Sequence, residues 1–170
     1  MKARLVSLMA AGLLALATAA PVGAVTIGDG FEVTTTLTVL NVPASITYQA
    51  VGGGALDPGE ESAVVTVSPD VSSNGDVSVT YSVPGGFTGP ETLPASVRQV
   101  AMLDGANGFT RNAGLGPAFY DSDFFGGYDP LYSASQPTNA TFDMELKVLV
   151  PASAAPGTYT GSMELSFTNV

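Results

Sequence analysis

Carboxylates are the main side chains of this sequence that could do chemistry, because the chain contains no histidine and no cysteine. The usual general base, the thiol nucleophile and most transition-metal ligands are therefore missing. Asp121, Asp123 and Asp129 form a local acidic cluster among aromatic residues. Such acids could hydrolyse a glycosidic bond, or bind Ca²⁺ through several oxygens. We favour a role for these three acids as solvated turn residues, and predict a non-enzymatic protein without a cofactor, with Ca²⁺ as the alternative.

These acids lie in a long irregular stretch, residues 104–138, which is rich in glycine and aromatic residues. Long loops in compact domains are usually functional or poorly ordered, and this one has too many aromatic residues to be merely solvated. Phe124, Phe125 and Tyr128 predict either an exposed contact patch, for a carbohydrate for example, or a plug that closes one end of the fold. We favour the plug.

The elements that must position these residues are β-strands. Apolar residues at every second position of residues 142–150 and 159–167 predict two strands with one buried face each. A Pro/Gly turn joins them, so we expect an antiparallel pair. Asn74-Gly75 is a strong hairpin signal, which predicts that residues 62–67 pair with residues 76–83.

Alternation also predicts a long first strand over residues 31–39, a shorter one over residues 44–50 and, more weakly, another over residues 95–103. Glycine and proline separate these segments, most densely at residues 52–59. No segment after the first 24 residues has helical spacing with caps. The sequence therefore predicts an all-β protein, an antiparallel Ig-like or jelly-roll-like β-sandwich of roughly seven to nine strands.

Residues 1–24 have the parts of a secretory signal peptide, with Lys2 and Arg4 before an apolar run and small residues before a cleavage site. We expect a secreted or cell-surface protein whose mature chain, residues 25–170, is a single domain. Removal of two of the five basic residues leaves three against fifteen acids, so the net charge changes from −10 to −12. This charge argues against a nucleic-acid partner. The apolar run is short for a retained anchor, so we expect no membrane insertion after cleavage.

Two phrases resemble the framework of secreted Ig-like sandwich domains: LDPGEESAVVTV at residues 56–67 and LVPASAAPGTYTG at residues 149–161. These domains include the TasA/camelysin-like fibre subunits, to which archaeal bundling pilins are similar, and the WxL-type surface domains. The chain has no tryptophan and so lacks the Trp-x-Leu signature of the last group. Resemblance to the fibre subunits implies assembly by donor-strand exchange, in which the N-terminal strand of one subunit completes the sheet of a neighbour.

The predicted N-terminal tail, residues 25–30, fits such a role because it carries apolar residues on a glycine link. Its candidate assembly residues are Val25, Thr26, Ile27, Gly28 and Gly30. We therefore expect a structural subunit of an extracellular filament or surface layer, with other copies of itself as the partner. The alternative is a monomeric secreted module that binds carbohydrate or Ca²⁺ through residues 104–138, and a hydrolase is the third possibility.

One N-x-S/T sequon is present, and it begins at Asn139. The sequon precedes a predicted strand, where an attached glycan would face solvent. Asn139 is therefore a candidate glycosylation site.

Overall fold

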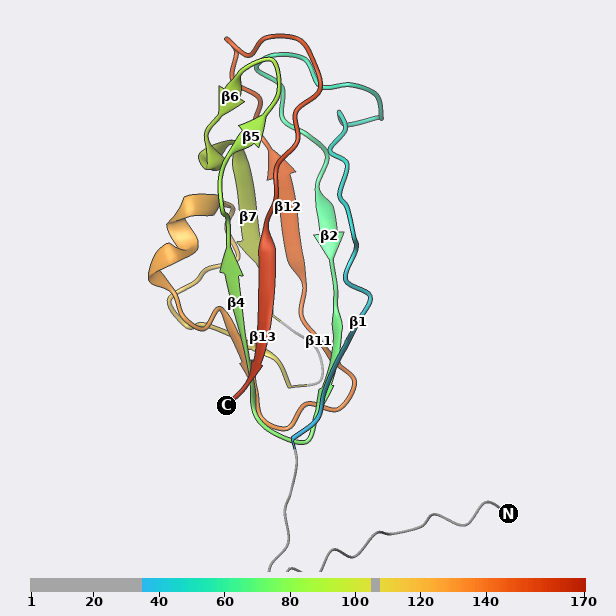
Figure 1. Cartoon of the computed structure of the whole chain (residues 1–170), viewed down its shortest axis with the longest axis vertical. Helices are drawn as coiled ribbons and strands as arrows, with labels where there is room; N and C mark the ends of the chain where they lie inside the picture. Colours follow the sequence, from blue (N-terminus) through green and yellow to red (C-terminus); the bar gives the residue numbers. More distant parts are fainter. Residues whose placement is uncertain (1–34, 105–107) are drawn as a thin grey trace, which may run out of the picture. The chain divides into compact units, whose positions relative to one another are not determined.

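The computed structural model describes residues 35–104 and 108–170, which lie in one compact unit, Thr34–Val170. The predicted signal peptide and the candidate assembly residues Val25, Thr26, Ile27, Gly28 and Gly30 lie outside the described residues. The unit is almost entirely β-structure, with short antiparallel strands that form two principal sheets (Figure 1). The all-β prediction is confirmed.

Two long, interrupted strands form the centre of the first sheet. One consists of β2 (Val65–Val67) and β3 (Asp70–Ser73), and the other of β11 (Ala140–Thr141) and β12 (Met144–Val148). They pair in one continuous register, since Thr141 faces Asp70 and Met144 faces Val67. The ladder is interrupted at Pro69, which has no backbone N–H to donate. Ser68 Oγ bridges the gap by donating to Asp143 Oδ1 at 2.6 Å.

The other strands of the first sheet flank this pair. β1 (Leu37–Leu40) pairs with β3 and forms one edge of the sheet. On the other side, β7 (Arg98–Met102) pairs with β12, and β9 (Tyr120–Asp121) pairs with β7. A short 3₁₀ helix, η1 (Ala95–Val97), leads into β7.

The second sheet has the order β13, β4, β10, β8. Its long strands are β13 (Glu164–Asn169) and β4 (Val77–Ser82), and its shorter ones are β10 (Tyr132–Ala134) and β8 (Thr110–Arg111). A separate hairpin of β5 (Phe87–Thr88) and β6 (Thr92–Leu93) lies between β4 and η1 in the chain. The 3₁₀ helix η2 (Ser122–Gly127) packs beside β4 and β7, on the side of the sandwich away from β1 (Figure 1).

The core lies where the apolar faces of the two sheets meet. Phe142, between β11 and β12, stacks on Tyr132 of the second sheet with ring centres 4.3 Å apart. Alternation decides which residues are buried: in β12 every second side chain is buried, while Glu145 and Lys147 are only partly so. The largest fully buried side chains are Tyr132, Phe125, Phe142, Met102, Leu131, Met144 and Leu146.

The predicted hairpin at Asn74-Gly75 is wrong. β3 lies in the first sheet and β4 in the second, so this turn connects the two sheets and does not join paired neighbours. A two-residue hairpin of the usual type needs positive φ at both residues, and neither Asn74 nor Gly75 has it. Asn74 Oδ1 instead accepts from the Thr36 N–H at 2.7 Å, which ties the turn to the segment before β1.

The predicted pairing of the two C-terminal strands is also wrong, although both strands are present. β12 pairs with β2 and β7, whereas β13 pairs with β4 in the opposite sheet. The chain between them arches from one sheet to the other, so that the two apolar faces meet each other. The strand predicted over residues 44–50 is absent as well, since only Ala50 there forms a bridge, to Ser62.

Candidate functional site

Among residues 35–104 and 108–170, the sandwich is open along one side, where each sheet ends in a strand whose outer edge no other described strand pairs with. β1 ends the first sheet and β13 ends the second. Beyond β1 the first edge continues as residues 43–48, which line a cavity together with residues 158–163 of the second edge. We call the strip between these two edges the seam. Its apolar side chains are only half buried; they are Leu37, Val39, Ile46, Tyr48, Met163, Leu165 and Phe167.

The outer edge of β13 has free backbone groups. Val170 N–H donates to Asp76 at 2.9 Å, and bonded pairs alternate in an antiparallel ladder. The N–H and C=O groups of Leu165, Phe167 and Asn169 therefore point away from β4, and no described strand pairs with them. Edge strands are commonly protected by lysine, proline or a bulge, but β13 has only Glu164 as a charged residue. β13 is thus open to the addition of another strand.

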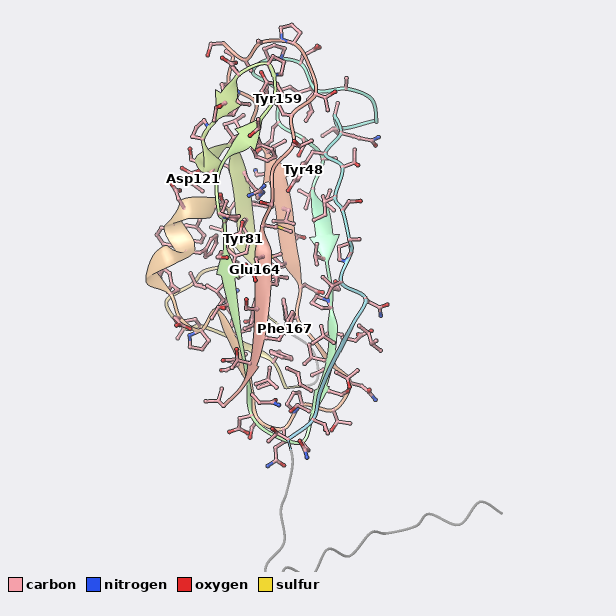
Figure 2. The ribbon with its side chains drawn as sticks, in the orientation of Figure 1. Tyr48, Tyr81, Asp121, Tyr159, Glu164 and Phe167 are labelled. Carbon is pink, nitrogen blue, oxygen red and sulfur yellow. The ribbon has the colours of Figure 1, made fainter. Side chains whose placement is uncertain are left out.

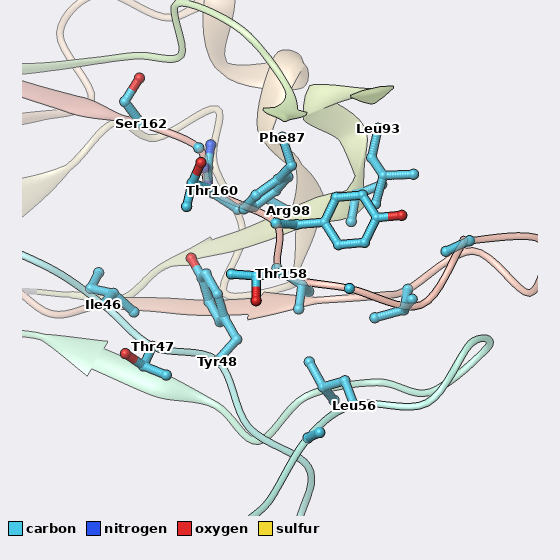
Figure 3. Close-up of a pocket in the computed structure, with 18 of the residues that line it drawn as sticks. Ile46, Thr47, Tyr48, Leu56, Phe87, Leu93, Arg98, Thr158, Thr160 and Ser162 are labelled. Atoms are coloured by element: carbon cyan, nitrogen blue, oxygen red, sulfur yellow. The ribbon is translucent and has the colours of Figure 1, made fainter. Parts of the chain in front are cut away.

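The cavity in the seam has a volume of about 710 Å³ and mainly apolar walls. Figure 3 shows Tyr48, Phe87 and Arg98 gathered within it, with Leu56 and Leu93 farther along the wall. Gly161 leaves room for the side chains of Phe87 and Arg98, because a Cβ at this position would lie 2.9 Å from Phe87 Cδ1 and 3.1 Å from Arg98 Nη2. The cavity therefore brings a positive charge next to a strip of half-buried apolar surface.

Arg98 is the unusual residue of the cavity. Its side chain is 2% exposed, and its guanidinium carbon lies 4.7 Å from the centre of the Phe87 ring. The Tyr48 and Tyr81 hydroxyls lie close to the guanidinium, but among the described residues no hydrogen bond of ordinary geometry reaches its buried Nε and Nη1 atoms. In the part of the chain that the structure describes, Arg111 pairs with Asp104 and Lys147 with Glu61, but no carboxylate pairs with Arg98. A buried cation of this kind is costly unless an anion joins it.

Two tyrosines share the surroundings of Arg98. Burial raises the pKa of Tyr81 to about 12, and the nearby Arg98 charge offsets only part of that rise. Burial likewise raises the pKa of Tyr48, again partly offset by Arg98. Both phenols therefore stay neutral at physiological pH and supply no negative charge to Arg98. The Tyr81 hydroxyl is itself buried near Arg98 and Ser122, but no described residue gives it a hydrogen bond of ordinary geometry.

Sequence reasoning did not identify Arg98 as a site residue. One signal could have indicated it, since Arg98 is one of only three basic residues left after the predicted cleavage. It also alternates in phase with Val100 and Met102, which are both fully buried in β7. A cation on the apolar face of a strand in an acidic chain is a candidate binding residue.

The acids that suggested a calcium site are spread along η2 and its ends. Asp121 stands just before η2 without a capping side-chain hydrogen bond and accepts from Gln99 Nε2 at 3.4 Å, whereas Asp123 and Asp129 are exposed. Among residues 35–104 and 108–170, no three acidic side chains come together as a group that could hold a metal ion. The arrangement therefore adds no support to the calcium prediction.

The aromatic residues of η2 have divided roles. Phe125 is 1% exposed and packs edge-on against Tyr81, with ring centres 5.8 Å apart. Phe124 is 42% exposed and stacks flat on Tyr120 at 4.5 Å, with Tyr128 beside it. Phe125 thus belongs to the core at the side of the sandwich away from the seam. Only Phe124 and its neighbours present aromatic surface outside.

Asn139 is exposed and has a positive φ of 49°. Its backbone N–H donates to Ser72 Oγ at 2.9 Å, and its side-chain oxygen accepts from the same hydroxyl at 3.2 Å. The position is therefore accessible, and glycosylation there stays a prediction.

No helix within the described part of the chain is long and apolar enough to cross a bilayer.

The comparisons with other proteins identify no family. The resemblance to fibre subunits and surface domains stays a prediction from the sequence phrases alone. No family model, curated protein or solved structure matches this chain.

Proposed function

We propose that this protein is a non-enzymatic structural subunit of an extracellular filament or surface layer. Its N-terminal segment, residues 25–30, adds as a β-strand to a neighbouring subunit after the leader has been removed. The observation that carries the proposal is the seam, where no described strand pairs with the outer edge of β13 and its apolar face is only half buried. An added strand would bond to the free backbone groups and cover the exposed apolar surface at once.

The side chains of β13 suit this role because they alternate. Leu165 and Phe167 are half buried and pack against the core, while Glu164 and Thr168 are exposed. A strand laid against β13 would need apolar residues at every second position to cover the same face. Val25 and Ile27 are spaced in this way.

The test uses the mature chain, from Val25 to Val170, at high concentration. Deletion of residues 25–30 should abolish filaments in negative-stain microscopy while leaving the thermal unfolding transition of the subunit in place. The double variant Val25→Thr with Ile27→Thr keeps the length of the segment and should also fail to assemble, because it removes the apolar contacts. Thr26→Ser is the matched control and should assemble normally. Filaments that persist without residues 25–30 would show that another surface assembles them.

A monomeric carbohydrate-binding module is the second candidate, supported by the flat stacking of Phe124 on Tyr120. An exposed aromatic face of this kind suits the apolar face of a sugar ring. In that case Phe124→Ala would abolish glycan binding, whereas the deletion of residues 25–30 would leave glycan binding unchanged. Glycan-array screening of the mature protein separates the two functions.

A further inference from the structure

We propose that Arg98 of one subunit binds the carboxylate of Asp29 in the N-terminal segment of the next subunit, and so sets the register of the added strand. This inference rests on the proposed function, and it deepens it by naming the pair of charges that aligns donor and acceptor. The acceptor site is the cavity in the seam, with Arg98 at its base. The occupant is residues 25–33 of a second copy, which extends the proposed donor segment, residues 25–30, by three residues.

The first argument is the missing partner of Arg98. A guanidinium keeps its charge at all ordinary pH values, so burial cannot be relieved by loss of a proton. Two of its nitrogen atoms are buried without a hydrogen bond of ordinary geometry to any described residue. The cavity is open to the seam and its walls are otherwise apolar or uncharged, so a carboxylate on an incoming apolar strand would complete the site.

The second argument is the side-chain alternation of residues 25–33. Val25, Ile27, Phe31 and Val33 occupy the odd positions, and the one charged residue on this face is Asp29. Glu32 lies on the opposite face. A strand that turned its apolar face into the seam would therefore carry a single carboxylate with it, at the centre of the segment. An acid in that place is unfavourable without a cation, and Arg98 supplies one.

The third argument is spacing. Gly161 lies at the level of Arg98, because its missing Cβ would stand 3.1 Å from Arg98 Nη2. Met163 and Leu165, two and four residues farther along the edge, are half-buried seam residues. Asp29 likewise has apolar residues two and four positions away in both directions. If Asp29 lies beside Arg98, a parallel strand would place Phe31 and Val33 against Met163 and Leu165. An antiparallel strand would place Ile27 and Val25 there instead.

The fourth argument compares two lengths along the chain and favours Asp29 of another subunit. Arg98 pairs with Val148, which bonds to Ser62, whereas Leu37 at the start of β1 pairs with Ser73. The eleven residues from Ser62 to Ser73 are largely extended, which separates the two levels by about 36 Å. The eight residues from Asp29 to Leu37 reach at most about 29 Å. Even a fully extended segment would thus leave the Asp29 backbone about 7 Å short of the level of Arg98, which favours an Asp29 that comes from another subunit.

The contact is consequently head-to-tail. The described chain enters at the β1 end of the unit, and the Arg98 cavity lies near Tyr48 and Tyr159 toward the other end (Figure 2). A heterologous contact between the two ends leaves one free donor and one free acceptor on every growing chain. Such a contact produces an open filament unless it closes into a ring.

The decisive experiment compares Asp29→Asn with Glu32→Gln in the full mature chain. Both changes remove one negative charge from the same segment, but only Asp29 shares its face with the apolar residues. The concentration needed for filament formation should rise about ten-fold or more for Asp29→Asn, because it leaves Arg98 buried without its partner. Glu32→Gln should stay within about two-fold of wild type, since an exposed charge contributes little.

A second measurement reports the contact directly. The chain has no cysteine, so introduced pairs report without background. Either Ile27→Cys or Phe31→Cys, each combined with Met163→Cys, should give a ladder of disulfide-linked subunits on oxidation, and which of the two does so reveals the strand direction. Glu32→Cys with Met163→Cys is the matched control and should give none.

The outcomes separate this inference from the proposed function. If deletion of residues 25–30 abolishes filaments but Asp29→Asn assembles like wild type, strand addition stands and the Arg98 pairing is wrong. If filaments survive the deletion, or if the wild-type mature chain forms no filaments, both the proposed function and the Arg98 pairing are wrong. If inorganic phosphate raises the melting temperature of wild type but not of Arg98→Met, and Asp29→Asn has no effect, then the partner of Arg98 is a free anion and the proposal is overturned.

Discussion

The rings of Phe142 and Phe167 face each other across the two sheets with their centres 6.0 Å apart, and only Phe142 is fully buried. Phe142 also stacks on Tyr132 and meets Phe109 edge-on, whereas Phe167 borders the open seam. The sandwich is therefore tightly packed at its centre and incompletely covered along one side. This asymmetry leads to the first prediction.

Phe142→Ala should lower the free energy of unfolding by about 3–5 kcal/mol, the usual cost of removing a buried phenylalanine. Phe167→Ala should cost less in the isolated subunit, about 1–2 kcal/mol, because part of its ring is already exposed to water. Urea denaturation of the two variants checks this order. Equal losses would mean that Phe167 is covered in the subunit by something other than a neighbour.

The hydroxyl groups of Tyr81 and Tyr132 give a matched pair of substitutions. Tyr132 Oη donates to the Asp143 carbonyl at 2.8 Å, while the buried Tyr81 hydroxyl has no hydrogen bond of ordinary geometry to any described residue. Tyr132→Phe should therefore destabilise the protein by about 1–2 kcal/mol, and Tyr81→Phe should be neutral or slightly stabilising at pH 7. Thermal unfolding of both variants measures the difference. A clear loss for Tyr81→Phe would reveal that its hydroxyl is bonded in solution.

Alkaline pH should weaken the fold through the same tyrosines. The pKa of Tyr81 rises from 10.0 to about 12 because burial disfavours the phenolate. Below pH 10 both the folded and unfolded states keep the proton, so the stability is fully present. Between pH 10 and 12 only the unfolded state loses it, and the free energy of unfolding should fall by about 1.4 kcal/mol per pH unit.

Burial also raises the pKa of Tyr132, which acts in the same direction. Urea unfolding at several pH values from 8 to 12 would measure the slope. Tyr81→Phe should make that slope shallower. An unchanged slope would mean that other groups control the alkaline transition.

Gly85 and Gly86 are adjacent but differ in their surroundings. A Cβ on Gly86 would lie 1.9 Å from the Leu93 carbonyl oxygen, whereas one on Gly85 would meet nothing within 4 Å. Gly86→Ala should therefore disrupt the β5–β6 hairpin and destabilise the protein by about 2 kcal/mol or more, as overpacking does. Gly85→Ala should change the stability by less than about 1 kcal/mol. Similar melting temperatures for the two variants would contradict the close approach at Gly86.

The sequence alone predicted the strands where side chains alternate clearly. Residues 142–148 follow a period of two, and the structure buries Phe142, Met144, Leu146 and Val148 in the predicted phase. The turn at residues 52–59 was equally predictable from its glycines and proline. In the structure four of these glycines adopt positive φ. These features depend on neighbouring residues only, and so a local pattern is enough to identify them.

Strand pairing was decided by the tertiary structure. Alternation tells which face of a strand is buried, but both sheets of a sandwich bury their faces in the same core. The pattern therefore cannot tell whether consecutive strands pair in one sheet or face each other from two, as β12 and β13 do. The lack of a described carboxylate partner for Arg98 depends on the same question of which strands pair. Whether its charge has a partner is decided by residues far apart in the chain, which meet only when both sheets have formed.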